Sequence, residues 1–206
     1  MSTTAPFTRL KRVTALSGAG LLTALGLAFA VPTSASAATP TCHDLVATIV
    51  GTEGSDDIEG TPGDDVIVGL GGHDEIDGNG GNDTICGNAG NDEIDGGSGD
   101  DWLQGGTGND EIEGGSGNDR LYGSSGDDDL EGGSGKDRLD GYSGHDRLEG
   151  GSGNDRLYGK AGQDLLEGNR GSDHLNGGAD ADQKYQGSAS ERVEDAWERQ
   201  FRGDDD

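Results

Sequence analysis

The hydrophobic pattern of the chain is a single large aliphatic residue at every ninth position. Isoleucine or leucine occupies each of these positions from Ile58 to Leu175, without an insertion or a deletion. One apolar residue between two residues of other types indicates a strand of about three residues with one side chain turned inward. The pattern therefore predicts many short strands, each contributing one residue to a narrow core, joined by short turns.

Around this position lies a nine-residue unit that repeats fifteen times across residues 51–185. Its pattern is GGxGxDxUx, where U is the aliphatic residue, and clear copies occupy residues 114–122 and 150–158. Column one is glycine in all fifteen units and column four in fourteen, whereas column two is glycine in only six. We expect columns one and four to need a positive φ or a close approach of backbones, and column two, which accepts side chains, to need neither.

Column six is aspartate in every unit, and a surface that needs only solvation does not require such regularity. Carboxylate and carbonyl oxygens at a regular spacing suit a hard cation such as calcium. Zinc prefers histidine or cysteine, and the four histidines do not cluster in the sequence. The candidate metal ligands are therefore Asp56, Asp65, Asp74, Asp83, Asp92, Asp101, Asp110, Asp119, Asp128, Asp137, Asp146, Asp155, Asp164, Asp173 and Asp182.

The unit resembles the RTX, or haemolysin-type, calcium-binding nonapeptide repeat, and the resemblance covers all fifteen units. It implies an all-β fold, a right-handed parallel β-roll (solenoid) in which two successive units complete one coil. Odd units then stack on odd units, and even units on even ones. The resemblance also implies that calcium binds between the turns of units n and n+2, held by column-six carboxylates and backbone carbonyls of the turns. Fifteen units give at most about thirteen such ions.

Composition adds a condition for folding. The chain is 29% hydrophobic, contains 42 glycines and carries a formal net charge of −27, which is typical of a chain that cannot form a core unaided. We therefore expect the metal-free roll to be largely unfolded and its folding to be coupled to calcium binding. The acidic excess also argues against nucleic acid as a partner, because the two would repel each other.

Residues 1–37 have the pattern of a cleaved secretory signal peptide. A basic region with Arg9, Lys11 and Arg12 precedes an apolar run over residues 21–31 and a stretch of small residues. The apolar run is about half of the roughly 20 residues that a membrane-spanning helix needs. We therefore expect a secreted, extracellular, monomeric protein with no membrane insertion. Removal of this segment changes the formal net charge from −27 to −30, because it takes away three basic residues and no acidic one.

The two segments that flank the repeats are predicted to cap the roll. Residues 38–50 end in an apolar, β-prone run, and Ile49 lies nine residues before Ile58, so this segment is expected to form an N-terminal cap strand. Residues 186–206 contain Val193, Trp197 and Phe201 at helical spacing. This pattern predicts a C-terminal amphipathic helix that covers the last coil, followed by an acidic tail.

The only two cysteines are Cys42 and Cys86, and in a secreted protein they favour a disulfide over two free thiols. If the cap continued the roll strictly, the two residues would lie two coils apart, about 9.6 Å by strand spacing. A disulfide needs Cα atoms within about 7 Å. The pairing therefore requires the N-terminal cap to leave the roll and fold across the face formed by the even units.

The outer columns seven and nine differ between odd and even units. In the odd units they are mostly aspartate and glutamate, whereas in the even units they include arginines and aromatic residues. The difference is explained either by drift of a duplicated eighteen-residue unit or by a face that binds a cell-surface polysaccharide or a protein. The candidate partner face consists of Trp102, Arg120, Tyr122, Arg138, Arg156 and Tyr158.

No motif for catalysis accompanies the repeats. The sequence has no nucleophile elbow, no HExxH motif and no carboxylate pair apart from the acids of the repeat itself. RTX toxins and proteases carry a separate catalytic or pore-forming domain, so their activity is not transferred to this chain. We expect a secreted, non-enzymatic calcium-binding protein that folds on binding calcium. The alternative is an adhesin or extracellular matrix protein that calcium makes rigid and that uses the even face.

Overall fold

The computed structural model describes residues 39–186. All regular structure in this range is β, and no helix that could cross a membrane is found among these residues. The signal peptide predicted for residues 1–37 and the amphipathic helix and acidic tail predicted within residues 186–206 lie outside the described residues, apart from Gln186.

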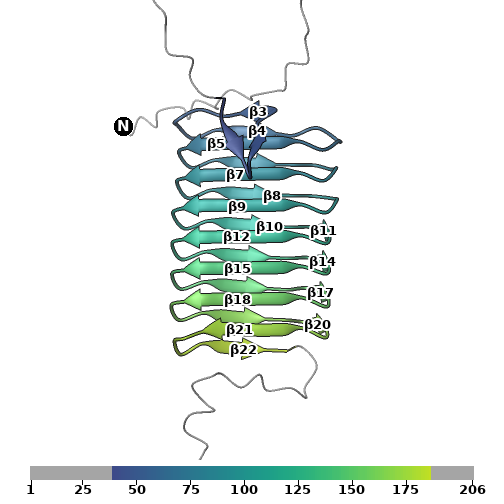
Figure 1. Cartoon of the computed structure of the whole chain (residues 1–206), viewed down its shortest axis with the longest axis vertical. Helices are drawn as coiled ribbons and strands as arrows, with labels where there is room; N and C mark the ends of the chain where they lie inside the picture. The colour runs from purple at the N-terminus through teal and green to yellow at the C-terminus, as the bar shows by residue number, and fades with distance from the viewer. Residues whose placement is uncertain (1–38, 187–206) are drawn as a thin grey trace, which may run out of the picture.

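The chain winds into coils that stack along one axis (Figure 1). Parallel partners are eighteen residues apart, as in the pairs Ile112 with Leu130 and Leu121 with Leu139. Two nine-residue units therefore complete one coil, and odd units stack on odd units and even units on even ones. This arrangement confirms the all-β parallel β-roll predicted from the sequence.

The even units form one sheet of eight parallel strands, the even sheet. Most of its strands are six residues long, because each one continues from columns seven to nine of an even unit into the first three residues of the next unit. The strands are β3 (Ile49–Val50), β5 (Val66–Gly71), β7 (Thr84–Ala89), β9 (Trp102–Thr107), β12 (Arg120–Ser125), β15 (Arg138–Ser143), β18 (Arg156–Ala161) and β21 (His174–Gly178).

The odd units form a second sheet of eight parallel strands, the odd sheet. Its members are β4 (Asp57–Glu59), β6 (Glu75–Asp77), β8 (Glu93–Asp95), β10 (Glu111–Glu113), β13 (Asp129–Glu131), β16 (Arg147–Glu149), β19 (Leu165–Glu167) and β22 (Gln183–Tyr185). A four-stranded sheet lies along the turns of the later even units. It consists of β11 (Ser116–Gly117), β14 (Ser134–Gly135), β17 (Ser152–Gly153) and β20 (Arg170–Gly171).

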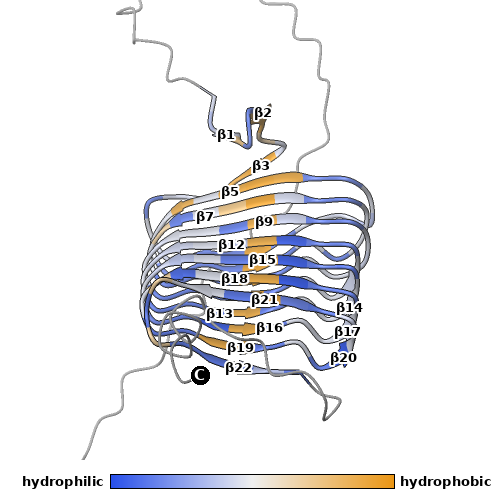
Figure 2. Ribbon diagram, turned by 60° about the horizontal axis from the view of Figure 1, so that its bottom comes forward, coloured by the Kyte–Doolittle hydropathy of each residue, from blue (hydrophilic) through white to orange (hydrophobic). Residues whose placement is uncertain are grey.

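The core consists of one row of aliphatic side chains from each of these two sheets, which together form a single cluster. Figure 2 shows the hydrophobic positions recurring from strand to strand. It contains the column-eight residues from Ile58 to Leu175, each at most 2% exposed. Ile49 extends the row by one position before the first unit, because β3 pairs with β5 in the same register as the repeats. The roll therefore begins one strand earlier than the glycine pattern indicates, and fifteen units together with β3 give eight coils.

Truncation of one central core residue is expected to be costly. Leu121 is fully buried between Leu103 and Leu139 of the neighbouring coils. We expect Leu121→Ala to lower the unfolding free energy of the calcium-loaded protein by about 2–5 kcal/mol, because the narrow row cannot close the cavity. Urea denaturation measures this change. Val46→Ala, at a position 59% exposed, is the control, and an equal loss in both variants would contradict the assigned core.

The N-terminal cap differs from the single strand predicted for residues 38–50. Only Ile49–Val50 continues the roll, while β1 (Thr41–Cys42) and β2 (Leu45–Val46) form an antiparallel hairpin. A disulfide joins Cys42 to Cys86 with Cα atoms 5.7 Å apart, so the hairpin crosses the even sheet. Cys42, Val68 and Cys86 form a second small core beneath it. This packing and the disulfide hold β1 and β2 in the hairpin, although the spacing of the apolar run predicted a single strand of the roll.

Candidate metal sites

The column-six aspartates lie in the turns and point inward. Those from Asp74 to Asp164 are 1–2% exposed, although they carry a charge, and Asp65 is 7% exposed. In each coil the backbone N–H of one aspartate donates to Oδ1 of the aspartate eighteen residues later. The distance from Asp101 N to Asp119 Oδ1 is 2.8 Å, and from Asp119 N to Asp137 Oδ1 it is 2.9 Å. The column-six carboxylates thus form two continuous ladders, one along each set of turns.

The second oxygen of most of these carboxylates has no hydrogen-bond partner. Thirteen buried Oδ2 atoms have no donor within the described residues. A buried carboxylate oxygen without a donor is energetically costly and is a natural ligand for a cation. The atoms are Oδ2 of Asp74, Asp83, Asp92, Asp101, Asp110, Asp119, Asp128, Asp137, Asp146, Asp155, Asp164, Asp173 and Asp182.

The first two units differ from the others, because threonine in column two satisfies the second oxygen. Thr52 donates to Asp56 Oδ2 through its backbone N–H at 2.6 Å and its hydroxyl at 2.9 Å. Thr61 does the same for Asp65 Oδ2, at 2.7 and 2.8 Å. Asp56 and Asp65 therefore have an alternative to a metal ion that the later units lack.

Column five forms a further set of hydrogen bonds between coils, the column-five ladder, which the repeat pattern had not led us to expect. Its backbone N–H groups donate to column-five side chains of the preceding coil, opposite in direction to the aspartate ladder. Asn91 N–H donates to His73 Nδ1 at 2.8 Å, and Asn109 N–H donates to Asn91 Oδ1 at 2.9 Å. The signal was present in the sequence, since column five consists mainly of asparagine, aspartate, histidine and serine.

Glycine shapes the turns differently from the expectation. From Gly72 to Gly171 column four has positive φ and close backbone contact, as predicted, and a Cβ at Gly117 would overlap the carbonyl oxygen of Gly99. Gly54 and Gly63, in the first two units, are not among the glycines with positive φ. Column one has close contact without positive φ: a Cβ at Gly96 would lie 2.7 Å from Asp101 Oδ2. The expectation for column two was wrong, because from Leu70 to Gly178 this column has positive φ, even where it is Leu70 or Tyr142.

Burial alters the acidity of the column-six carboxyls. The pKa of Asp119, Asp128 and Asp137 is raised from the ordinary value of 3.8 to about 7, chiefly because burial disfavours the charged form. A backbone hydrogen bond opposes the shift, and neighbouring aspartates add to it. The metal-free turns therefore hold their negative charge poorly, and a bound cation would restore it.

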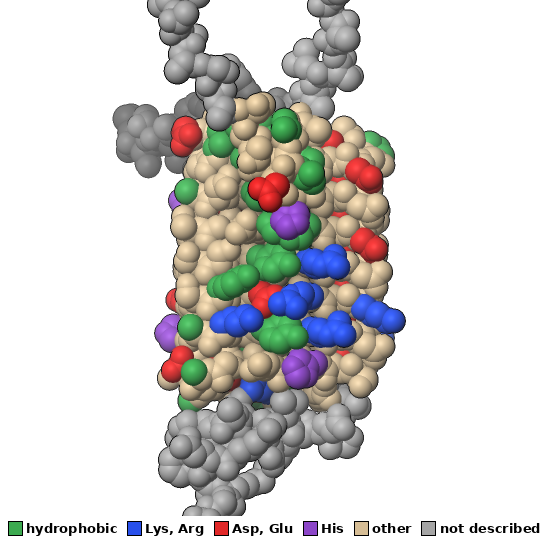
Figure 3. Space-filling view, in the orientation of Figure 1, with side chains coloured by type: hydrophobic (Ala, Val, Ile, Leu, Met, Phe, Trp, Pro, Cys, Tyr) green, Lys and Arg blue, Asp and Glu red, His purple; other side chains and the backbone are tan. Residues whose placement is uncertain are grey.

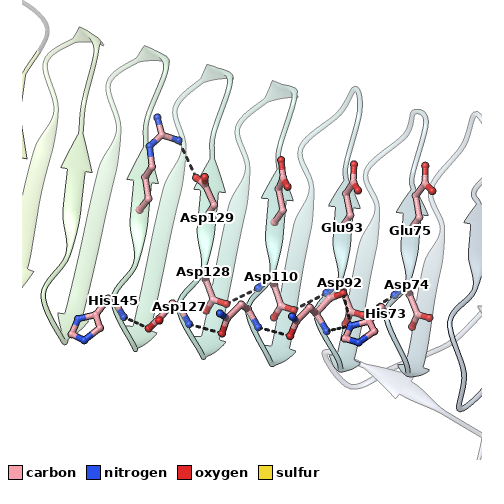
Figure 4. A pocket seen from close by; sticks show the side chains of 14 residues that line it. His73, Asp74, Glu75, Asp92, Glu93, Asp110, Asp127, Asp128, Asp129 and His145 are labelled. Carbon is pink, nitrogen blue, oxygen red and sulfur yellow. Dashed lines mark hydrogen bonds and ion pairs between the residues drawn. The ribbon is translucent and has the colours of Figure 1, made fainter.

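On the odd face a groove runs beside one row of these turns (Figure 4). Its walls come from columns five, six and seven of successive odd units, so Asp74, Asp92, Asp110 and Asp128 stand in one line. Column seven adds further acids, including Glu75, Glu93 and Asp129. Arg147 also lines the groove and pairs with Asp129 at 3.0 Å. The groove is acidic and open along the roll axis.

The donor set fits calcium better than a transition metal. Within residues 39–186, no three side chains of histidine, cysteine, aspartate or glutamate converge into a cluster that would hold a metal. A metal in these turns would therefore take carboxylate oxygens from neighbouring coils together with backbone carbonyls. Calcium accepts such mixed oxygen ligands at high coordination number. The buried Oδ2 atoms show that the residues present suit such an ion.

Buried carboxylates repeated along the turns of a parallel β-roll define a calcium-binding β-roll protein. The model of the RTX calcium-binding nonapeptide repeat family matches the chain in four copies, over residues 50–85, 86–121, 122–157 and 149–183. The matches cover more than half of the chain, which belongs to this family. Its repeats bind several calcium ions. A search of curated proteins finds no match.

The six residues of the candidate partner face all lie on the even sheet. Trp102 is on β9, Arg120 and Tyr122 on β12, Arg138 on β15, and both Arg156 and Tyr158 on β18. Parallel pairing places Trp102, Arg120, Arg138 and Arg156 in one row across four adjacent coils. The structure thus brings these residues together on one surface.

Proposed function

We propose that the protein is a secreted, extracellular, non-enzymatic calcium-binding protein that folds when it binds calcium. The single observation that carries this proposal is the set of thirteen buried aspartate oxygens without a hydrogen-bond donor. A chain with a net charge of −27 has to bury these oxygens in order to form its coils. RTX repeat proteins are typically extracellular, which supports the proposed location.

Different columns of the repeat contribute to folding in different ways. Column-eight side chains form the core, and the column-five and column-six ladders pair the backbone N–H groups of the turns. Column-six carboxylates from Asp74 onward would hold the ions with the turn carbonyls. Calcium supplies positive charge that removes the repulsion between neighbouring carboxylates. Each coil then provides a template for the next, so folding is expected to propagate along the roll.

Circular dichroism of the full chain, purified from an exporting host, tests this proposal. In chelator we expect the spectrum of a largely unfolded chain, and on calcium titration a cooperative gain of β signal. Magnesium at the same concentration is the control, and it should fail because it prefers a more rigid octahedral shell. A complete β signal in chelator would refute folding on binding, and calorimetry of the same titration gives the number of ions.

A calcium-rigidified adhesin or matrix protein is the second candidate function. It is favoured by the aromatic and basic residues gathered on adjacent coils of the even sheet (Figure 3). The loaded roll would then act as a rigid support for that face. Retention of the protein on cell surfaces in calcium, and its release by chelator, would separate this function from that of a free calcium-binding protein.

A further inference from the structure

Four aromatic rings line a groove on the even sheet. His43 stacks on Trp102 with ring centroids 4.4 Å apart, Trp102 contacts Tyr122 at 5.1 Å, and Tyr122 contacts Tyr142 at 6.3 Å. Gln104 and Ser124 complete the lining, and Gln104 Nε2 donates to Ser124 Oγ at 3.1 Å. The groove thus combines flat apolar faces with hydrogen-bonding groups.

The walls of this groove come from three different sources. Trp102 and Tyr122 belong to the outer columns of even units, while Tyr142 occupies column two of an odd unit with φ of 76°. His43 lies at the tip of the N-terminal hairpin, which the Cys42–Cys86 disulfide fixes to the even sheet. Tyr142 is 46% exposed, so its ring is accessible to a ligand.

A basic cluster continues the groove along the same face (Figure 3). Asp140, only 1% exposed, pairs with Arg138 at 2.7 Å and with Lys160 at 3.1 Å. Arg138 and Lys160 also lie over the ring of Tyr158, each 4.8 Å from its centroid. The cluster is therefore held in place by contacts within the protein, and the charge of Asp140 offsets only one of its cations.

Arg120 and Arg156 flank Arg138 in the row of arginines. Both are exposed, and neither forms an ion pair with another residue in the described part of the chain. Residues 39–186 contain eight lysines and arginines, and four of them are in this cluster. A protein of net charge −27 thus concentrates its available positive charge beside its aromatic groove.

We propose that this surface binds an acidic polysaccharide that lies along the roll axis. The C–H faces of its sugar rings would stack on Trp102, Tyr122 and Tyr142, and Gln104 and Ser124 would bond its hydroxyls. Its acidic groups would meet Arg120 and Arg156, which can bind a carboxylate or sulfate through two N–H donors. Flat rings in a row, with hydrogen-bonding groups between them, fit a chain of sugar rings better than an acidic peptide.

This inference rests on the proposed function to the extent that the surface exists only in the folded roll. Calcium would have a second effect, because ions held in the turns would offset much of the negative charge of the molecule. An acidic polysaccharide would otherwise be repelled by most of the molecule. Binding is therefore expected only in calcium, and the fold of each sample is to be checked by circular dichroism.

Calorimetry of the full chain in calcium with hyaluronate oligosaccharides tests the proposal. The double variant Arg120→Gln with Arg156→Gln should weaken binding by about tenfold or more, the effect of losing a charge-assisted contact. The control removes two exposed charges elsewhere, Lys136→Gln with Arg170→Gln, and should keep the affinity within about twofold. Equal weakening in both double variants would show only net-charge attraction and would overturn the proposal.

A second pair of variants tests the aromatic wall. Tyr142→Ser is compatible with the backbone, because Ser124 occupies the same column with φ of 87°. We expect it to weaken hyaluronate binding by about tenfold, while Tyr185→Ser, at an exposed tyrosine of the odd sheet, leaves it unchanged.

Three outcomes decide the interpretation of these titrations. A chain that folds in calcium and binds no hyaluronate refutes this inference alone. Binding of polyglutamate in place of hyaluronate, lost in the same variants, would assign the surface to an acidic protein and also refute it. A chain already folded in chelator that still binds hyaluronate would instead refute the proposed folding on calcium.

Discussion

Gly117→Ala is expected to disrupt the calcium-loaded roll, whereas Gly63→Ala, the same change in the same column, should be harmless. Gly117 has φ of 145°, and an added Cβ would overlap the carbonyl oxygen of Gly99 in the preceding coil. Around Gly63 an added Cβ would meet nothing within 4 Å, and φ is not in the positive range. Comparison of the two variants therefore separates the effect of steric overlap in the turn from the general effect of replacing a glycine by alanine.

The cost at Gly117 has two parts. The backbone conformation alone disfavours alanine by about 1–3 kcal/mol. The turn must also move away from its neighbour, which breaks the hydrogen bond from Gly99 N–H to the carbonyl of Ser116, now 2.9 Å long. Because each coil contacts only its neighbours, a break at one interface leaves two shorter rolls that are each less stable.

Thermal unfolding in calcium, followed by circular dichroism, measures the effect. We expect Gly117→Ala to lower the midpoint and to split the transition into two, because the halves no longer support each other. Gly63→Ala should match the parent or be up to about 1 kcal/mol more stable, since it restricts the unfolded chain. Similar melting curves for both variants would contradict the close packing of the column-four turns.

The sequence was sufficient for those features that depend on regular spacing. One aliphatic residue per nine positions requires a short strand with one inward side chain, so the strands and the core from Ile58 to Leu175 could be predicted from the pattern. The column-six aspartates were recognised for the same reason. The coil of two units was implied by the resemblance to RTX repeats. Spacing could not show which individual atoms have hydrogen-bond partners. An example is Asp56 Oδ2, which accepts two hydrogen bonds from Thr52.

Other features were missed because a contact between distant segments overrides a local preference. Positive φ at Tyr142 or Lys160 costs about 1–2 kcal/mol, which made column two look unconstrained when it accepted such residues. Parallel pairing with the coils on either side offsets that cost. His43 entered the aromatic groove only through the hairpin that the disulfide fixes, so its neighbours in the sequence gave no indication of the stack on Trp102.

Acidification is expected to have opposite effects on the metal-free and the calcium-loaded protein. In the folded, metal-free roll, burial raises the pKa of Asp83, Asp119 and Asp137 to about 7, whereas in the unfolded chain their pKa returns to the ordinary 3.8. Between these two values the folded form binds more protons than the unfolded form. The unfolding free energy of the metal-free roll therefore decreases as the pH rises from about 4 to about 7.

Lowering the pH in chelator should consequently favour the coils. A proton on each buried carboxyl removes the charge that calcium would otherwise neutralise, and the repulsion along the ladder disappears. The penalty is absent below a pH of about 4 and fully present above about 7. We expect the β signal of the chelator-treated chain to be larger at about pH 5 than at about pH 7.5, at constant ionic strength.

With calcium the sign reverses, because the ion binds the deprotonated carboxylates and protons compete with it. The calcium concentration needed for half-maximal β signal should therefore rise as the pH falls from about 7.5 to about 5. Titrations at both pH values, in calcium and in chelator, measure the two trends on one sample. A β signal in chelator that did not increase on acidification would mean that the carboxyls are not buried in the metal-free fold, and calcium affinity independent of pH would remove these aspartates from the set of ligands.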